Sequence, residues 1–327
     1  MTNESIKGSI VKEYLLKYPS LGSRKIASLI YKDNKEVYDN EELIRNIVRY
    51  YRGSHGEINR NKLTPDTYLP KINLPYEDDY DFSPYLINNI DNYPILLAGD
   101  IHIPYYDQDA LEIFIERIID FKPKTIILAG DWIDFYAISK WQHNPRKRSV
   151  KDEIDLFNYI LDQIVKAANG AKIIYKYGNH EERFDNYIMN KAPELFELET
   201  IHLDNVLKLK ERGIELVKDK RIIRINHLNV IHGHEYIFSI SNPVNPARGL
   251  FNRAKKTSLC FHFHQTSEHT EPTISGEVIS AWSSGCLANL HPEYMPLNKW
   301  NHGFVEITNE DNFFNLRNRK IINYKLL

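Results

Sequence analysis

Residues 95–102 read ILLAGDIH, a short apolar run followed at once by a glycine, a carboxylate and an imidazole. A similar order returns at 125–134, TIILAGDWID, where an Asp follows the glycine, and at 172–180, KIIYKYGNH, where Asn and His follow it. Each run is rich in Ile and Leu and is bounded by glycine and charge, which is typical of a buried β-strand. These three stretches predict neighbouring strands whose carboxyl ends all carry polar side chains.

The segments between these strands have helical periodicity. Residues 108–121 and 150–168 each place their apolar side chains on one face. Strand–helix–strand spacing of this kind predicts βαβ units around a largely parallel sheet. Beyond residue 213 the helices thin out, and further strands are expected at 221–225, 228–232, 258–262, 277–283, 303–308 and 313–325. We therefore expect a second sheet packed on the first, with helices outside.

Residues 1–62 predict a separate, small, all-helical domain. Three apolar stripes at helical spacing lie within it, and the third is preceded by Asp39 and Asn40 as possible N-caps and closed by Gly53. Three short helices with tight turns are the pattern of a helix-turn-helix module. A Pro-rich, acidic linker is expected over 63–93, which leaves 94–327 for the large domain.

The composition is that of an ordinary globular protein. The chain has 327 residues, 42% hydrophobic, with a formal net charge of −2, which argues against a disordered chain or a bulk polycation. The first ten residues lack the apolar stretch of a secretory signal, and no run approaches the ~20 apolar residues that a membrane span needs. Only two cysteines occur, so we expect no disulfide framework. Since neither a signal nor a membrane span is evident, we also expect no membrane contact and a cytoplasmic location.

Three arginines in the helical domain form a row. Arg45, Arg49 and Arg52 fall at i, i+4 and i+7, opposite the apolar stripe, in a span that carries 12 Lys and Arg against 8 Asp and Glu. Such a face could enter a nucleic-acid groove or follow phosphates. The alternative is a solvated face on a small docking or oligomerisation module.

The polar residues at the strand ends have the chemistry of a metal site. Carboxylates, imidazoles and an amide oxygen are the ligands that a pair of divalent cations requires. In an extended backbone Asp100 and His102 would point to the same side, as would His262 and His264. In open α/β sheets the carboxyl ends of the strands form the ligand crevice. The candidate residues are Asp100, His102, Asp131, Asn179, His180, His232, His262 and His264.

Each of these motifs, taken alone, can have a purely structural role. A single Asp at a strand end is more often a turn former or a helix cap, and an isolated pair of histidines usually lies on the protein surface. The complete series D-x-H, GDxxD, GNH, HGH and H-x-H at successive strand ends favours a site. His234 could bind metal in place of His232 or beside it. His143 with residues 146–148 could line the path by which a phosphate reaches the site, or form a solvated basic loop.

This series resembles the calcineurin-like metallophosphoesterase superfamily, from about residue 94 towards the C-terminus, and looks most like its bacterial and phage members. The resemblance implies a four-layer α/β/β/α sandwich of two mixed sheets, preceded here by the helix-turn-helix-like domain. It also implies host cytoplasm as the location if a phage encodes the chain. The implied ligands of the first metal are Asp100, His102 and His264; Asp131 would bridge, and Asn179, His232 and His262 would hold the second metal. His180 is implied as the proton donor and Asp134 as the residue that orients it.

The resemblance implies hydrolysis of a phosphoester by attack of a hydroxide that bridges two divalent ions. Donors of nitrogen and oxygen without thiolate suit Mn²⁺, Fe or Zn²⁺. The leading expectation is a phosphodiester in a nucleic acid or nucleotide, with DNA or RNA bound through the helical domain. A phosphomonoesterase or Ser/Thr protein phosphatase is one alternative, and a nucleic-acid-binding or structural protein with a vestigial metal site is another.

Two residues depart from the family pattern. Phe261 stands where the last motif commonly has glycine, and it would be strained if that position needed a positive φ. Phe135 stands where protein phosphatases of this superfamily follow GDxxD with a phosphate-binding arginine. The second departure weakens the phosphoprotein alternative and favours diesters or nucleotides.

Overall fold

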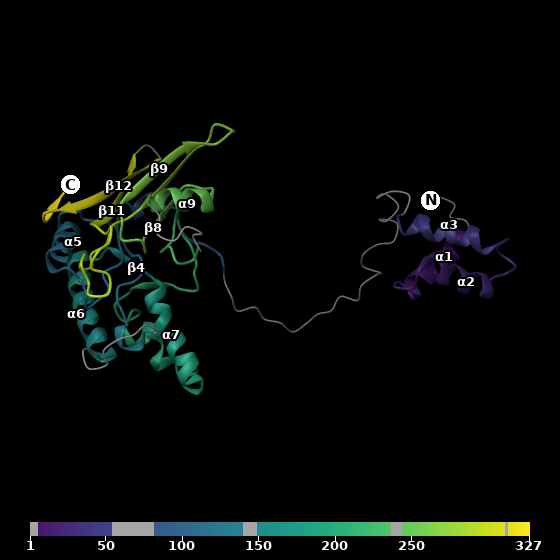
Figure 1. Ribbon diagram of the computed structural model, residues 1–327, viewed down its shortest axis with the longest axis horizontal. Coiled ribbons are helices and arrows are strands. Elements are labelled where there is room, and N and C mark those ends of the chain that lie inside the picture. The colour runs from purple at the N-terminus through teal and green to yellow at the C-terminus, as the bar shows by residue number, and fades with distance from the viewer. Residues whose placement is uncertain (1–5, 54–81, 140–148, 237–243, 311–312) are drawn as a thin grey trace. The chain divides into compact units, whose positions relative to one another are not determined.

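The computed structural model describes residues 6–53, 82–139, 149–236, 244–310 and 313–327. The chain divides into two compact units, Met1–Asp78 and Asp79–Leu327 (Figure 1). Within the described ranges, every helix is too short or too polar to cross a lipid bilayer.

The first unit is a three-helix cluster. It contains α1 (Ile6–Lys17), α2 (Ser23–Asp33) and α3 (Glu41–Tyr51), which confirms the helical prediction for this part of the chain. The Asn40 side chain caps α3 by accepting a 2.9 Å hydrogen bond from the Leu43 amide. The stripes meet in one small core, which includes Val11, Leu15, Ile26, Ile30, Ile44 and Val48.

The second unit is built on a seven-stranded sheet. Its order is β13-β12-β11-β2-β3-β4-β5, parallel from β2 to β5 and antiparallel from β2 to β13. The strands are β2 (Ile95–Ala98), β3 (Thr125–Leu128), β4 (Lys172–Lys176), β5 (Glu215–Val217), β11 (His302–Glu310), β12 (Phe313–Ile322) and β13 (Lys325–Leu326).

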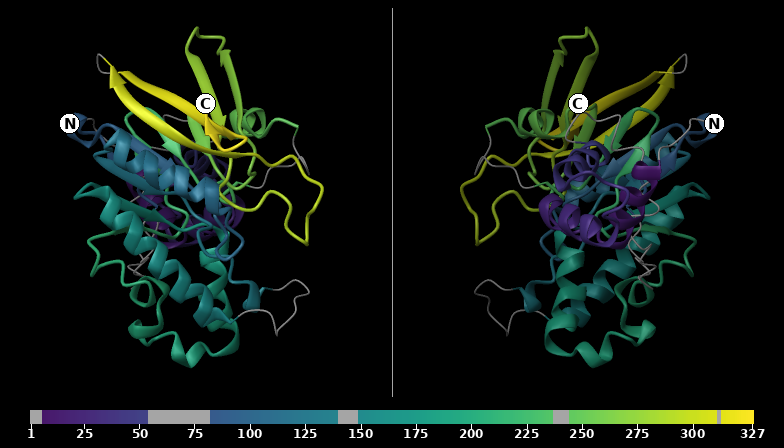
Figure 2. Two further views of the ribbon diagram at one scale, coloured as in Figure 1. Left: turned by 90° about the vertical axis from the view of Figure 1, so that its left-hand side faces the viewer. Right: turned by 90° about the vertical axis from the view of Figure 1, so that its right-hand side faces the viewer.

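A six-stranded sheet packs face to face against it, in the order β1-β6-β7-β8-β10-β9. This sheet also mixes parallel and antiparallel pairs. Its strands are β1 (Tyr85–Ile87), β6 (Ile223–Ile225), β7 (Leu228–Val230), β8 (Ser258–Cys260), β9 (Ser267–Pro272) and β10 (Val278–Ser283). The hairpins β9–β10 and β11–β12, green and yellow in Figure 2, project from the body of this unit.

Helices complete the layers. The long helices α5 (Gln108–Phe121) and α6 (Val150–Ala168) pack on the seven-stranded sheet through a core that includes Phe114 and Phe157. The remaining helices are α7 (Asn179–Lys191), α8 (Leu203–Val206), α9 (Pro246–Ala254) and the 3-10 turns η2 (Ile90–Asn92), η3 (Tyr136–Ile138), η4 (Pro193–Leu195) and η5 (Glu199–Ile201).

Three hydrophobic cores show the order of the layers. One separates α5 and α6 from the first sheet, a second fills the space between the sheets with residues such as Ile127 and Leu259, and a third joins α9 to the second sheet. Burying both faces of each sheet in this way gives the α/β/β/α sandwich. The predicted fold class is confirmed.

Two segments differ from the sequence expectation. The strands β11 and β12 belong to the first sheet, not the second, because β11 pairs antiparallel with β2 and covers what would otherwise be its free edge. An alternating apolar pattern reveals a buried face but not which sheet a strand joins. Residues 85–87, which the sequence places in the linker, form β1, since Tyr85–Ile87 pairs with β6 and buries Ile87. Residues 63–81 of the expected linker lie outside the described residues.

Candidate metal centre

The two sheets bring their polar strand ends to one place. Asp100 follows β2, Asp131 follows β3, and Asn179 opens α7 directly after β4, three neighbouring parallel strands. His232 and His262 follow β7 and β8, which are parallel neighbours in the other sheet. The carboxyl ends of both sheets therefore face a common centre, as predicted from the strand–ligand order.

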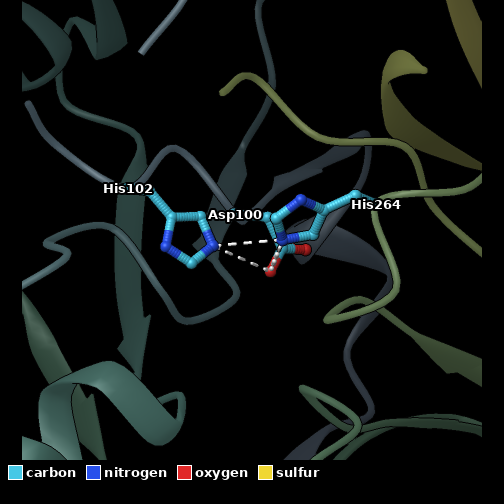
Figure 3. Close-up of side chains that lie close together, drawn as sticks. All are labelled: Asp100, His102 and His264. Atoms are coloured by element: carbon cyan, nitrogen blue, oxygen red, sulfur yellow. Dashed lines mark hydrogen bonds and ion pairs between the residues drawn. The ribbon is translucent and has the colours of Figure 1, made fainter. Parts of the chain in front are cut away.

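The first group of donors contains Asp100, His102 and His264 (Figure 3). The His264 Nε2 atom lies 3.3 Å from Asp100 Oδ1 and 3.1 Å from His102 Nε2. All three side chains are buried. These residues fit the ligand set that the family resemblance assigns to the first metal.

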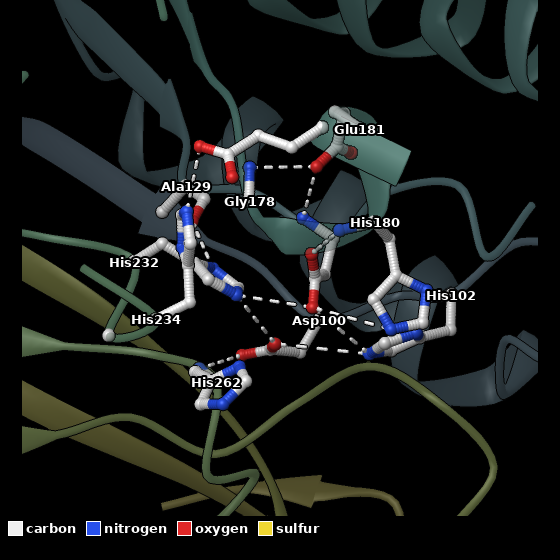
Figure 4. Close-up of polar contacts among 12 residues, drawn as sticks. Asp100, His102, Ala129, Gly178, His180, Glu181, His232, His234 and His262 are labelled. Atoms are coloured by element: carbon white, nitrogen blue, oxygen red, sulfur yellow. Dashed lines mark hydrogen bonds and ion pairs between the residues drawn. The ribbon is translucent and has the colours of Figure 1, made fainter. Parts of the chain in front are cut away.

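The second group contains Asp131, His232 and His262. The His232 Nε2 atom lies 3.1 Å from Asp131 Oδ2, and its Nδ1 atom lies 2.9 Å from the Ala129 carbonyl oxygen. That carbonyl needs a donor, so Nδ1 carries a hydrogen and Nε2 faces the centre. Figure 4 shows His232 and His262 on one side of Asp100, with His102 and His180 on the other.

Asp131 lies between the two groups. Its Oδ2 atom is 3.1 Å from His232 Nε2 and 3.8 Å from His102 Nε2, so one oxygen can contact cations on both sides. Its Oδ1 atom accepts a 2.9 Å hydrogen bond from the His180 amide. The chain approaches Asp131 so closely at Gly178 that an added Cβ would lie 2.2 Å from Oδ1, which is why glycine stands there.

The donor set fits two divalent cations. The Asn179 Oδ1 atom is buried and has no hydrogen-bond partner within the described ranges, as expected of an oxygen that awaits a cation. Burial opposes charge on Asp131 and on His232, but their mutual attraction prevails, so the pKa of Asp131 falls well below its usual value and that of His232 rises to about 10. Burial also opposes charge on His264, and Asp100 raises its pKa to about 10. A cation bound here would replace these protons.

Asp134 holds two histidines. Its Oδ1 atom lies 3.2 Å from His180 Nδ1 and 3.2 Å from His102 Nδ1. Burial opposes the charge of this carboxylate, but the hydrogen bonds from His102 and His180 lower its pKa. Burial also disfavours charged His180, yet Asp131 and Asp134 raise its pKa above the ordinary value. The geometry therefore suits a histidine that is oriented and kept protonated by carboxylates, while the same Asp134 also orients a metal-facing histidine.

Arg183 is a site residue that the sequence reasoning missed. Its Nη1 atom donates a 2.7 Å hydrogen bond to the Asp134 carbonyl oxygen, and its Nη2 atom lies 3.2 Å from His180 Nε2. The helical spacing could have revealed it, because a residue three positions after His180 in α7 lies on the same face. A guanidinium beside the metal centre has the shape and charge to bind a phosphate.

Two buried carboxylates support the ligands from behind. Glu181 accepts hydrogen bonds from the amides of Asp131 and Gly178. Glu235 accepts a 3.0 Å hydrogen bond from the His232 amide and pairs at 2.8 Å with buried Lys176. The sequence reasoning assigned neither, although Glu directly follows the GNH and HGH motifs.

The backbone at the ligands is not extended. The prediction that Asp100 and His102, or His262 and His264, converge by strand alternation is wrong, because all four have a positive φ, between 53° and 71°. The side chains converge through left-handed turns, a conformation that Asp and His adopt more readily than most residues. Phe261 does not have a positive φ, so the strain expected at this position is absent, and its side chain is fully buried between the sheets. The positive φ angles belong instead to His262 and His264.

Phe135 and His234 belong to neither donor group, although the His234 ring lies 5.2 Å from that of His232. Phe135 is buried and packs on Phe184, with ring centroids 5.1 Å apart, so it offers nothing to a phosphate. The His234 Nε2 atom lies 3.0 Å from Glu182 Oε1, and His234 belongs to neither donor group. His143 and residues 146–148 lie outside the described residues.

A groove borders the metal centre along one face of α7. It has a volume of about 640 Å³ and is lined by Ile138, Ser139, Asn179, Arg183, Asn186, Tyr187, Asn190 and Lys191. The lining begins at the proposed metal ligand Asn179 and continues with amide and cationic side chains. A substrate that extends beyond a single phosphate could follow this face.

Comparisons with known proteins agree with the motif series. Residues 93–291 match the model for the calcineurin-like phosphoesterases. Similar solved structures include zinc-bound Vps29 from Entamoeba histolytica, 12% identical over 72% of this chain and 96% of that one, with a TM-score of 0.38. A dimetal phosphatase from Danio rerio is 11% identical over 72% and 98%, with a TM-score of 0.35. The phosphoesterase YfcE from E. coli is 12% identical over 69% and 98%, with a TM-score of 0.33. No curated protein matches the chain.

Proposed function

Because the chain belongs to the calcineurin-like phosphoesterase family, we propose that it hydrolyses a phosphodiester in a nucleic acid or nucleotide with two divalent metal ions. The observation that carries this proposal is the meeting of two donor groups at Asp131, beside the His180–Asp134 pair. Asp100, His102 and His264 would hold one ion, and Asn179, His232 and His262 the other. Mn²⁺, Fe and Zn²⁺ all suit these donors.

Two such ions, when bound, would supply a water activated for attack and positive charge against the phosphoryl oxygens. Residues of the chain would supply the proton for the leaving group and bind the substrate phosphate. His180 gives its Nε2 proton to the departing ester oxygen as the phosphorus–oxygen bond breaks, and Asp134 holds the opposite ring nitrogen. Arg183, which now contacts His180 Nε2, would turn its guanidinium to the substrate phosphate and so free that nitrogen for proton transfer.

Two features favour a diester over a monoester. The α7 groove offers polar contacts for a chain beyond the scissile phosphate, through Arg183, Asn186 and Asn190. Phe135 is buried at the position where protein phosphatases of this superfamily carry an arginine. A second ester group on the phosphate would therefore find space and partners along α7.

A comparison of aryl phosphates tests this preference. With Mn²⁺-loaded protein of measured metal content, we expect kcat/KM to be higher on bis(4-nitrophenyl) phosphate than on 4-nitrophenyl phosphate. The reverse order would discard the diesterase and support the phosphomonoesterase. Metal-loaded protein that is inactive on every phosphoester tried would support the binding or structural alternative.

We also propose that the first unit binds nucleic acid. A groove of about 600 Å³ at the start of α2 is lined by Gly22, Ser23, Arg24, Lys25, Arg45 and Arg49, which gathers four cations around exposed backbone. Arg52 plays a different part, because its Nη1 atom donates to Ser23 Oγ at 3.1 Å and its Nη2 atom to the Leu21 carbonyl. The predicted arginine row is thus reduced to Arg45 and Arg49.

Replacing Arg45 and Arg49 together with alanine should weaken duplex DNA binding at all sequences. Removing one ion pair between an arginine and a DNA phosphate should reduce the slope of log K against log salt by about 1. Titrations at several salt concentrations measure this, with Lys32→Ala at the opposite end of α2 as the matched control. Unchanged affinity in the double variant would contradict the proposal and favour a protein-docking unit.

A further inference from the structure

A row of aromatic side chains begins at the metal centre. The Trp300 ring lies 4.2 Å from that of His264, Tyr294 lies 6.4 Å from Trp300, and Tyr105 lies 6.0 Å from Tyr294. We call Tyr105, Tyr294 and Trp300 the aromatic wall. Because His264 belongs to the first donor group, the wall starts within contact of a proposed metal ligand.

Hydrogen bonds hold the wall in place. The Asn301 amide donates to the His264 carbonyl at 2.9 Å, and the Asn289 amide donates to the Tyr105 carbonyl at 2.7 Å. Between these anchors the Asn298 side chain donates to the Leu290 carbonyl and accepts from the Trp300 amide. The loop that carries Tyr294 and Trp300 is therefore braced at both ends and across its middle, so its rings are positioned before a ligand arrives.

The wall is accessible to solvent and lies near Asp134. Tyr294 is 51% exposed, so much of its ring is accessible. Burial of its hydroxyl, with Asp134 and Tyr105 nearby, raises the pKa of Tyr294 and keeps that hydroxyl neutral. Asp134 is the partner of His180, so the aromatic wall ends close to the group that would protonate the departing oxygen.

The two borders of the centre differ in chemistry. The α7 groove presents Arg183 and amide side chains, which suit phosphate and polar groups. The aromatic wall presents three aromatic rings, two of which carry a hydroxyl. A substrate that fits both borders needs a phosphate and, attached to it through a short link, a flat unsaturated ring.

We propose that the aromatic wall stacks a nucleobase of the substrate beside the scissile phosphate. This assignment rests on the proposed phosphodiesterase function and narrows its substrate class to esters of nucleosides. Nucleobases of every kind have a π-face, and stacking on an aromatic side chain lowers the free energy of binding irrespective of base identity. The wall would therefore recognise that a base is present without reading which base it is.

A pair of matched esters tests the assignment. Thymidine 5′-(4-nitrophenyl phosphate) and its abasic deoxyribose counterpart have the same scissile bond and leaving group and differ only in the base. Wild-type protein should prefer the thymidine ester in kcat/KM, mainly through KM. Trp300→Ala should reduce this preference about tenfold or more, Trp300→Phe should retain most of it, and Tyr159→Ala on the exposed face of α6 should leave it intact.

Inhibition separates failure of the wall from failure of the proposed function. Thymidine 5′-monophosphate should inhibit more strongly than deoxyribose 5-phosphate, whichever phosphoester the protein turns over, and Trp300→Ala should remove the difference. An equal loss on both esters and equal inhibition by both phosphates would overturn the stacking assignment and leave Trp300 as packing for His264. A protein that cleaves only monoesters but retains the Trp300-dependent inhibition difference would overturn the diesterase and keep the wall.

Discussion

Replacing Asp131 with alanine should abolish both metal uptake and turnover. Its Oδ2 atom is the one carboxylate oxygen of the described residues within 4 Å of His102, His180 and His232 Nε2. Without it, the second donor group loses a member, the first loses the oxygen that links it to the second, and the buried imidazoles lose a negative charge that compensates them. Metal content after dialysis against Mn²⁺ or Zn²⁺ and hydrolysis of an aryl phosphodiester measure the two losses.

The alanine variant also removes one partner of a buried ion pair, which typically costs about 3–5 kcal/mol of folding stability. Asp131→Asn keeps the shape of the side chain and should remain folded, so a loss of metal in this variant is not a loss of fold. Asp120→Ala on the exposed end of α5 is the matched control. An Asp131→Asn protein that still binds two equivalents of metal would refute the bridging role.

Replacing His180 with alanine should keep the metals and lower kcat by roughly 10²–10⁴-fold, the typical contribution of a general acid. The His180 ring contacts Asp134 and Arg183, and its Nε2 atom lies 3.9 Å from Asp131 Oδ2. The hydrogen bond to Asp131 Oδ1 comes from the His180 backbone amide, which the alanine variant keeps. The loss should be greatest for an alkyl leaving group and smallest for 4-nitrophenolate, because a stable anion departs without protonation.

Rates for a series of leaving groups, measured on metal-loaded protein, separate this role from others. His227→Ala, in the exposed turn between β6 and β7, is the matched control. A loss of equal size for every leaving group would mean that His180 positions the substrate and does not donate the proton. Loss of metal in His180→Ala would instead place this histidine among the ligands.

The sequence predicts the fold well where the apolar periodicity of a segment and its capping residues give the same bounds. The bounds of α5 agree with the sequence because Asp107 caps its first turn and the apolar stripe runs without interruption to Phe121. The strand–ligand order at Asp100, Asp131 and Asn179 likewise placed three polar residues at neighbouring parallel strand ends. That order predicted that these side chains lie close together.

Other features depend on contacts that a linear pattern does not contain. The pairing of β11 with β2 joins residues about 200 positions apart, and the alternation of a strand does not name its neighbour. Arg52 falls in the predicted phosphate-binding row by its spacing, but its guanidinium donates to Ser23 and to the Leu21 carbonyl instead. Arg183 lies one turn along α7 from His180, and a motif at a strand end does not extend to the helix that follows it.

The left-handed turns at the metal centre also affect the thermal stability of the protein. Asp100, His102, Asp131, His262 and His264 all have a positive φ, a conformation that typically costs non-glycine residues of the order of 1–3 kcal/mol. Glycine would relax the backbone at each position, but it would remove the donor atom. Thermal stability and activity therefore make opposite demands on the same five residues. Selection for a more heat-resistant protein should leave them unchanged and act on the two sheets and their helices.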